Sequence, residues 1–97
     1  MFKQILAKEL KQRLHEGGDL VLLDVRQNYE HDEFHIPNSL LIPLNELPER
    51  YSELETYIDK EIIVYCKAGV RSQMACQFLA AHGFKKLVNL ADGILGW

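Results

Sequence analysis

The chain has little cysteine: Cys66 and Cys76, ten positions apart, are the only two in 97 residues. Two cysteines are too few for a disulfide-stabilised secreted domain, and their spacing is not the C-x-x-C pattern of zinc and dithiol sites. We therefore expect both residues to be free thiols.

The chain also lacks a large excess of charge of either sign, because its formal net charge is only -3. Such a balance disfavours binding to nucleic acid or to an anionic membrane surface, for which proteins use basic patches. No apolar run approaches the length of a membrane span, and lysines interrupt the first residues before a signal-peptide core could form. These absences predict a cytoplasmic protein.

Repeats and compositionally biased tracts are absent as well. Hydrophobic residues make up 47% of the chain and charged residues 26%, which is ordinary globular composition. A chain of this length can bury one modest core. We expect residues 1–97 to form a single domain.

What the sequence does contain is an alternation of short apolar runs with amphipathic segments. The predicted strands are residues 19–26, 39–43, 60–66 and 86–90, and the predicted helical segments are 5–15, 44–58 and 71–82, with a turn or two of helix within 27–37. Strands that are apolar throughout are typical of parallel sheets covered by helices. The pattern predicts an α/β fold with an open, mainly parallel sheet of four to five strands and helices on both faces.

Cys66 ends the strongest predicted strand and stands just before a predicted helix. This is the edge of a parallel sheet where ligands bind, and Gly69 permits a sharp curl between strand and helix. The N–H groups of such a loop form an anion-binding nest, to which Lys67 and Arg71 add positive charge. Partial exposure, the cations and the helix N-terminus are all expected to lower the pKa of Cys66.

The residues alone leave two interpretations of Cys66 open. It is either an activated nucleophile suited to anionic electrophiles or a small apolar residue at the end of a buried strand. Cys76 lies in the middle of a predicted helix and is interpreted as a core residue rather than a resolving thiol.

Two long stretches of the chain resemble a known family. Residues 62–97, IIVYCKAGVRSQMACQFLAAHGFKKLVNLADGILGW, are similar to the C-terminal half of rhodanese-like sulfurtransferase domains. Residues 20–47, LVLLDVRQNYEHDEFHIPNSLLIPLNEL, resemble the other half, with its Asp-Val-Arg strand end, its Glu and its His-Ile-Pro segment. The resemblance spans residues 5–97.

The resemblance implies that Cys66 is the catalytic nucleophile and carries sulfur as a transient persulfide, with no other cofactor and no metal. The matching substrate- and persulfide-binding loop is Lys67, Ala68, Gly69, Val70, Arg71 and Ser72. Related phosphatases and arsenate reductases have a longer loop, Cys-x5-Arg, whereas here Arg71 comes fifth after Cys66. The count favours a cradle for one sulfur atom over a cradle for an oxyanion.

The implied activity is transfer of a sulfane sulfur from thiosulfate or a persulfide donor, through Cys66, to cyanide or a thiol. Lys67 and Arg71 are the expected binding groups for an anionic donor. The implied partners are these small molecules, with a sulfur-carrier protein as a further candidate, and neither nucleic acid nor membrane. Two alternatives stay open: a non-catalytic rhodanese-like interaction or regulatory module, and a protein-to-protein sulfur relay.

Asp24 and Arg26 match the family's Asp-Val-Arg. Charges at the end of a central strand favour a structural ion pair, and the alternative is that Asp24 supports the Cys66 loop by accepting its N–H groups. Glu30 is interpreted as the partner of Arg26.

A few residues depart from the family pattern or have a spacing that suggests another role. Phe34 and Asp92 stand where the family usually has glycine, and Asn38 begins the Asn-Ser that replaces its Gly-Ala; Asn38 and Asp92 are expected to tolerate positive φ. His31 and His35 are four apart, but no third ligand is evident, so a metal site is not predicted.

Overall fold

The computed structural model describes residues 2–97, which contain one five-stranded sheet in which every strand runs parallel to its neighbours. The strands are β1 (Lys3–Ile5), β2 (Leu20–Asp24), β3 (Leu40–Leu41), β4 (Glu61–Tyr65) and β5 (Leu87–Leu90). Their order is β1-β5-β4-β2-β3, so the strand that precedes Cys66 lies in the middle. The predicted parallel α/β sheet is confirmed.

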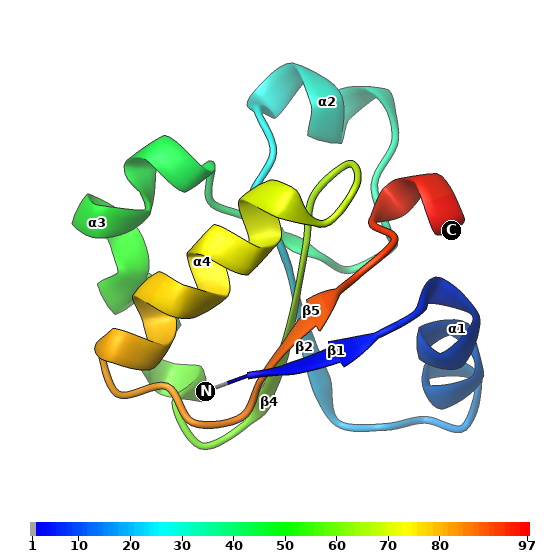
Figure 1. The fold of residues 1–97 in the computed structure, drawn as a ribbon, viewed down its shortest axis with the longest axis horizontal. Coiled ribbons are helices and arrows are strands. Elements are labelled where there is room, and N and C mark those ends of the chain that lie inside the picture. The colour runs from blue at the N-terminus through cyan, green and yellow to red at the C-terminus, as the bar shows by residue number, and fades with distance from the viewer. Residues whose placement is uncertain (1) are drawn as a thin grey trace.

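Helices cover both faces of the sheet, as predicted (Figure 1). They are α1 (Ala7–His15), α2 (Asn28–Glu33), α3 (Leu47–Arg50) and α4 (Val70–Ala81), with 3-10 turns η1 (Leu44–Glu46), η2 (Tyr51–Tyr57) and η3 (Ile94–Gly96). Leu47 of α3 and Leu79 of α4 pack in the core on one face, and Leu10 of α1 packs in the core on the other. Trp97 is partly buried and packs on the α1 side.

The start of the chain differs from the sequence prediction, which began a helix at residue 5. Ile5 instead ends β1, where it pairs with Leu90 of β5, and the helix begins at Ala7. An edge strand of three residues is too short to show a periodicity of its own. Residues 3–5 form a strand because they pair with β5.

Asp92 has a different role from the one expected of it. Among residues 2–97 the non-glycine residue with positive φ is Asn38, at 69°, so the expectation holds for Asn38 and is wrong for Asp92. The Oδ1 atom of Asp92 accepts the N–H of Ala7 at 2.9 Å. The carboxylate thus satisfies a free N–H at the positive end of α1, whose own N-cap residue is Leu6 and offers no side-chain acceptor.

Two further boundaries differ slightly from prediction. Residues 44–58 form η1, α3 and η2 instead of one turn and one helix, with Pro48 in the first turn of α3, where its missing N–H is tolerated. The helix predicted at 71–82 spans Val70–Ala81. Within residues 2–97, none of the helices combines the length and apolarity needed to cross a membrane.

Candidate active site

The chain turns sharply from β4 into α4, and Cys66 is the first residue of the turn. Gly69 makes the bend with φ of +96°, a conformation that costs glycine little, and it precedes the first residue of α4. A Cβ on Gly69 would lie 2.3 Å from the carbonyl oxygen of Ala91. The loop therefore packs directly against the segment that follows β5.

Hydrogen-bond donors surround the sulfur of Cys66. The N–H groups of Gly69 and Ser72 donate to Sγ at 3.2 and 3.3 Å, and the hydroxyl oxygen of Ser72 lies 3.4 Å away. Cys66 is only 1% exposed, so the expected partial exposure is wrong. Because β4 runs through the core, Cys66, which directly follows it, lies at the floor of the curled loop rather than at its rim.

Two opposing effects set the pKa of Cys66. Burial raises the pKa of the thiol, whereas the hydroxyl and N–H of Ser72 and the N–H groups of Gly69 and Ala68 lower it, and the net pKa lies below the ordinary value. These donors stabilise the thiolate by hydrogen bonding and act without nearby water. The thiolate is therefore favoured although the sulfur is buried.

We expect alkylation of native Cys66 by iodoacetamide to follow a pH midpoint below that of an ordinary cysteine. Only the thiolate reacts, so the rate is full above the lowered pKa and falls as the pH drops through it. The measurement uses a Cys76→Ala variant, so that a single thiol is observed, in buffer and again in 8 M urea. Unfolding removes the N–H donors and is expected to raise the midpoint, and a native midpoint at or above the unfolded one would contradict this account.

A buried polar chain behind the loop was missed by the sequence analysis. The hydroxyl of Ser72 donates to Oδ1 of Asn89, whose Nδ2 donates to Oε1 of Gln4 at 2.9 Å and to the carbonyl of Gly69 at 3.3 Å. Ser72 has one proton, so it donates either to Asn89 or to the thiolate, whereas the backbone N–H groups have no such competition. The available signal was a lone asparagine in an otherwise apolar strand.

The segment after β5 holds the base of the loop and was also missed. The N–H groups of Ile94 and Leu95 donate to the carbonyls of Cys66 and Lys67 at 2.9 and 3.2 Å. Gly93 adopts φ of 61° and ψ of −164°, and a Cβ there would lie 2.2 Å from the carbonyl oxygen of Lys67. Contacts between residues so distant in sequence leave no local pattern.

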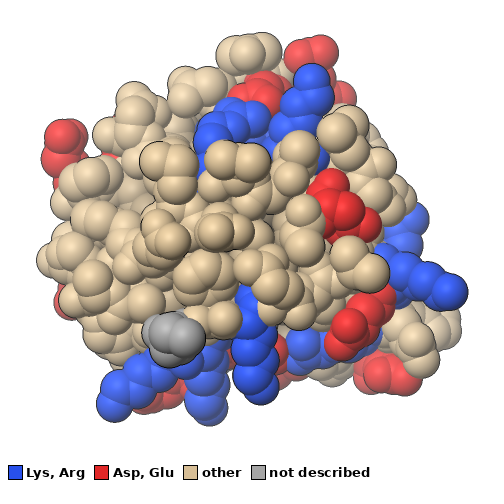
Figure 2. All heavy atoms as spheres, viewed as in Figure 1, with Lys and Arg blue, Asp and Glu red and all other residues tan. Residues whose placement is uncertain are grey.

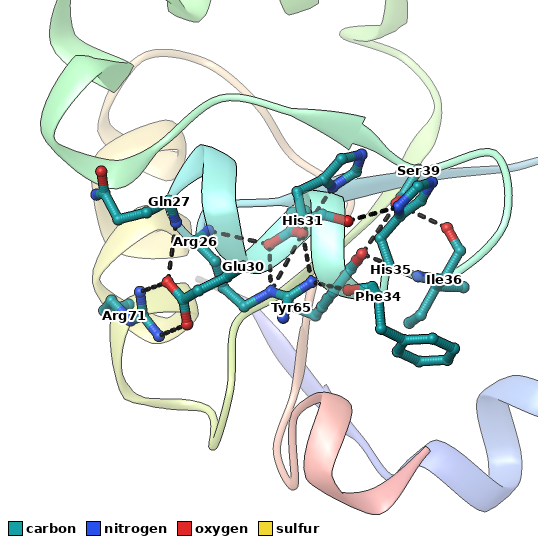
Figure 3. Close-up of polar contacts among 11 residues, drawn as sticks. Arg26, Gln27, Glu30, His31, Phe34, His35, Ile36, Ser39, Tyr65 and Arg71 are labelled. Atoms are coloured by element: carbon teal, nitrogen blue, oxygen red, sulfur yellow. Dashed lines mark hydrogen bonds and ion pairs between the residues drawn. The ribbon is translucent and has the colours of Figure 1, made fainter.

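Lys67 and Arg71, the two cations expected to bind a donor, differ from each other in exposure and in pairing. Lys67 is an exposed residue of the loop. Arg71 donates hydrogen bonds from both terminal nitrogens to the carboxylate of Glu30, at 2.8 and 3.0 Å (Figure 3). Val70 is 70% exposed at the start of α4 and presents an apolar side chain to solvent. The charge of Arg71 is therefore compensated by Glu30, a partner that the sequence analysis did not assign to it, and its role in binding a donor stays a prediction.

Asp24 and Arg26 form the buried ion pair that was expected, but neither supports the loop directly. Oδ2 of Asp24 accepts a hydrogen bond from Arg26 at 2.9 Å and lies 2.9 Å from Nδ1 of His31. Within residues 2–97, the N–H groups of Gly69 and Ser72 donate to Sγ and not to Asp24. Arg26 also donates to the carbonyl of Phe34, so its predicted pairing with Glu30 is wrong.

A cavity of about 320 Å³ opens beside the loop. Its lining residues are Arg26, Tyr29, Glu30, Glu33, Phe34, Lys67, Ile94 and Leu95. A larger hollow of about 680 Å³ lies at the amino ends of the strands, where Lys3 and Glu61 line it, and is remote from Cys66. The smaller cavity is therefore the one beside the Cys66 loop, and Phe34 forms part of its wall.

No group of three or more His, Cys, Asp and Glu side chains converges as a metal site in the part of the chain that the structure describes. The rings of His31 and His35 stack 3.7 Å apart. Nδ1 of His31 faces Asp24, and Nδ1 of His35 lies 2.8 Å from the carbonyl of His31. The spacing of four therefore lets the ring of His35 stack on the ring of His31 at the end of α2.

Comparison with known proteins gives matches over the whole chain. A family model described as "Rhodanese-like domain" matches residues 6–97. The chain is 35% identical to a protein named "Sulfurtransferase" from Allochromatium vinosum, over 100% of this chain and 89% of that one, and 36% identical to the Bacillus subtilis protein named "Putative sulfur carrier protein YrkF", over 97% of this chain and 50% of that one. A rhodanese-like domain protein from Staphylococcus aureus has a similar structure, with a TM-score of 0.89 and 32% identity over 98% of this chain and 90% of that one.

Proposed function

Since the chain belongs to the rhodanese-like domain family, we propose that it is a sulfurtransferase that carries sulfur as a persulfide on Cys66. The observation that supports this most is the buried Sγ atom with N–H groups of Gly69 and Ser72 directed at it. Relatives named sulfurtransferase at similar length agree with it. The proposed setting is the cytoplasm, because the chemistry needs Cys66 to stay reduced.

In the proposed loading step, the Cys66 thiolate attacks the outer sulfur of thiosulfate or of a persulfide donor. A bond forms between Sγ and that sulfur, and the bond from it to the donor breaks, so thiosulfate leaves as sulfite with the electron pair. The product is a Cys66 persulfide anion. The first turn of α4 leaves N–H groups without partners in the helix, and these are suited to hold the outer sulfur.

In the proposed transfer step, cyanide or a thiolate attacks the outer sulfur and the Cys66 thiolate leaves. With cyanide the products are thiocyanate and free Cys66, so no electrons or cofactor enter the cycle beyond the transient persulfide. The short distance in sequence from Cys66 to Arg71 supports sulfur over phosphate chemistry, since a longer loop is what encloses a tetrahedral oxyanion.

The natural donor and acceptor are part of the proposal. A thiol or a sulfur-carrier protein is the proposed acceptor, and the similarity to a protein named as a sulfur carrier favours a relay of this kind. A non-catalytic interaction module is the alternative from another class. The donors directed at Sγ are a reason to prefer catalysis, because a docking module has no need of a stabilised thiolate.

The test is to incubate the chain with thiosulfate and weigh it as an intact protein, then add cyanide and assay thiocyanate. We expect a gain of one sulfur atom that cyanide removes with stoichiometric thiocyanate. An unchanged mass with thiosulfate and also with an organic persulfide as donor, together with no thiocyanate, would overturn the proposal and leave the interaction module. Hydrolysis of an aryl phosphate measured in parallel covers the phosphatase alternative, and none is expected.

A further inference from the structure

An ion pair at the mouth of the Cys66 loop joins residues that are 41 positions apart. Nη1 of Arg71 donates to Oε1 of Glu30 at 2.8 Å, and Nη2 donates to Oε2 at 3.0 Å. Two parallel hydrogen bonds of this kind fix both side chains in one orientation. Figure 3 shows the guanidinium of Arg71 turned toward the carboxylate of Glu30.

Glu30 is held from its own helix as well. Its Oε1 atom accepts the N–H of Gln27 at 2.9 Å in the capping box at the start of α2, and its side chain is only 14% exposed. The hydrogen bonds from Arg71 outweigh burial and, with the N–H of Gln27, lower the pKa of Glu30 to about 2. The carboxylate therefore stays charged at any pH at which the chain would work.

The charges around the loop consequently cancel in pairs. Arg26 is paired with Asp24, and Arg71 is paired with Glu30. Lys67 is the loop cation with no ion pair among the residues that the structure describes. Figure 2 shows positive and negative side chains close together at the edge where Figure 1 places α2, rather than a field of one sign.

We propose that Glu30 is a specificity-determining residue that compensates the charge of Arg71 and so reduces the preference of Cys66 for multiply charged donors. Resting on the proposed function, this widens the range of donors to those of low negative charge, such as organic persulfides, beside dianions such as thiosulfate. A dianion gains twice as much from an uncompensated cation as a monoanion does, so removing the charge of Glu30 shifts the balance toward the dianion.

Glu30→Gln is the matched variant for this proposal. Glutamine at this position still accepts the N–H of the N-cap residue, because Glu and Gln serve equally in a capping box, and its oxygen still accepts from Arg71. The negative charge is lost, and with it the hydrogen bond from Nη2 of Arg71 to Oε2, because the amide nitrogen that takes the place of Oε2 does not accept. Asp32→Asn is the control, since Asp32 is an exposed carboxylate of the same helix without an ion pair in the described residues.

The first measurement does not depend on sulfur transfer. Cys66 of each variant is alkylated with iodoacetate, an anion, and with iodoacetamide, which is neutral, and the ratio of the two rates cancels any change in thiolate fraction. At a separation of about 6 Å in a water-like dielectric, one unit charge changes the rate of a monoanion about threefold. We expect the ratio to rise about threefold in Glu30→Gln, to change little in Asp32→Asn, and to return toward the wild-type value in high salt.

The second measurement is loading with thiosulfate, a dianion, and with methanethiosulfonate, a monoanion that transfers the same sulfur and leaves as methanesulfinate. We expect the ratio of the thiosulfate rate to the methanethiosulfonate rate to rise about threefold in Glu30→Gln. An unchanged or lower ratio in both measurements would overturn the proposal and make Glu30 a residue that only positions Arg71. A higher alkylation ratio without loading of any variant would support charge compensation and reject the sulfurtransferase.

Discussion

A Cys66→Ser variant is expected to gain no sulfur from thiosulfate and to release no thiocyanate. Serine has no sulfur to form the persulfide bond, and its hydroxyl is not ionised at neutral pH, so loading falls by at least about a thousandfold. The substitution is close in size, and the N–H groups of Gly69 and Ser72 that donate to Sγ are positioned to donate to the serine oxygen. The chain is therefore expected to stay folded, which its circular dichroism and thermal unfolding would check.

Cys76 provides the matched control for this result. It is fully buried in the same core cluster as Cys66, and burial alone raises the pKa of its thiol to about 12. A Cys76→Ala variant removes this thiol and is expected to load and release sulfur as the wild type does. Residual loading of Cys66→Ser that disappears when Cys76 is also replaced would instead show that Cys76 carries sulfur.

Local sequence patterns were enough to predict the central strands. β2, β4 and β5 are short apolar runs bounded by charged or turn residues, and their burial on both faces requires a parallel sheet between helices. β1 has no such pattern, because Lys3–Ile5 is ordered by its register against β5. α4 was also predicted from local sequence, between Gly69 and Gly83, whereas the helix predicted within 44–58 is broken into η1, α3 and η2.

The candidate site divides in the same way. The Cys66 loop is contiguous, so its donors and its glycine were visible in the sequence. Glu30 was assigned to Arg26, four positions away, because sequence reasoning favours close partners, whereas its partner Arg71 is 41 positions away. The predicted partial exposure of Cys66 was wrong for a related reason. The burial of a residue at the end of a strand depends on which distant segments pack over it.

A Gly93→Ala variant is expected to lose both stability and sulfur loading, although Gly93 is far from Cys66 in sequence. Its φ of 61° and ψ of −164° lie in a region used almost only by glycine. The added Cβ would lie 2.2 Å from the oxygen and 2.4 Å from the carbon of the Lys67 carbonyl, and 2.7 Å from the nitrogen of Ala68. Backbone cannot yield as a side chain does, so we expect a loss of about 3 kcal/mol in the free energy of unfolding.

Gly17→Ala separates backbone strain from this clash. Gly17 has a φ of +82°, and an added Cβ would find nothing within 4 Å, so only the left-handed conformation is penalised, by about 1 kcal/mol. Urea unfolding of both variants measures the difference, and sulfur loading is assayed well below each unfolding midpoint. A folded Gly93→Ala chain should still load poorly, because moving Lys67 and Ala68 displaces the loop whose N–H groups face Sγ. Equal stability of the two variants, with normal loading of both, would show that the loop does not depend on close contact with the segment after β5.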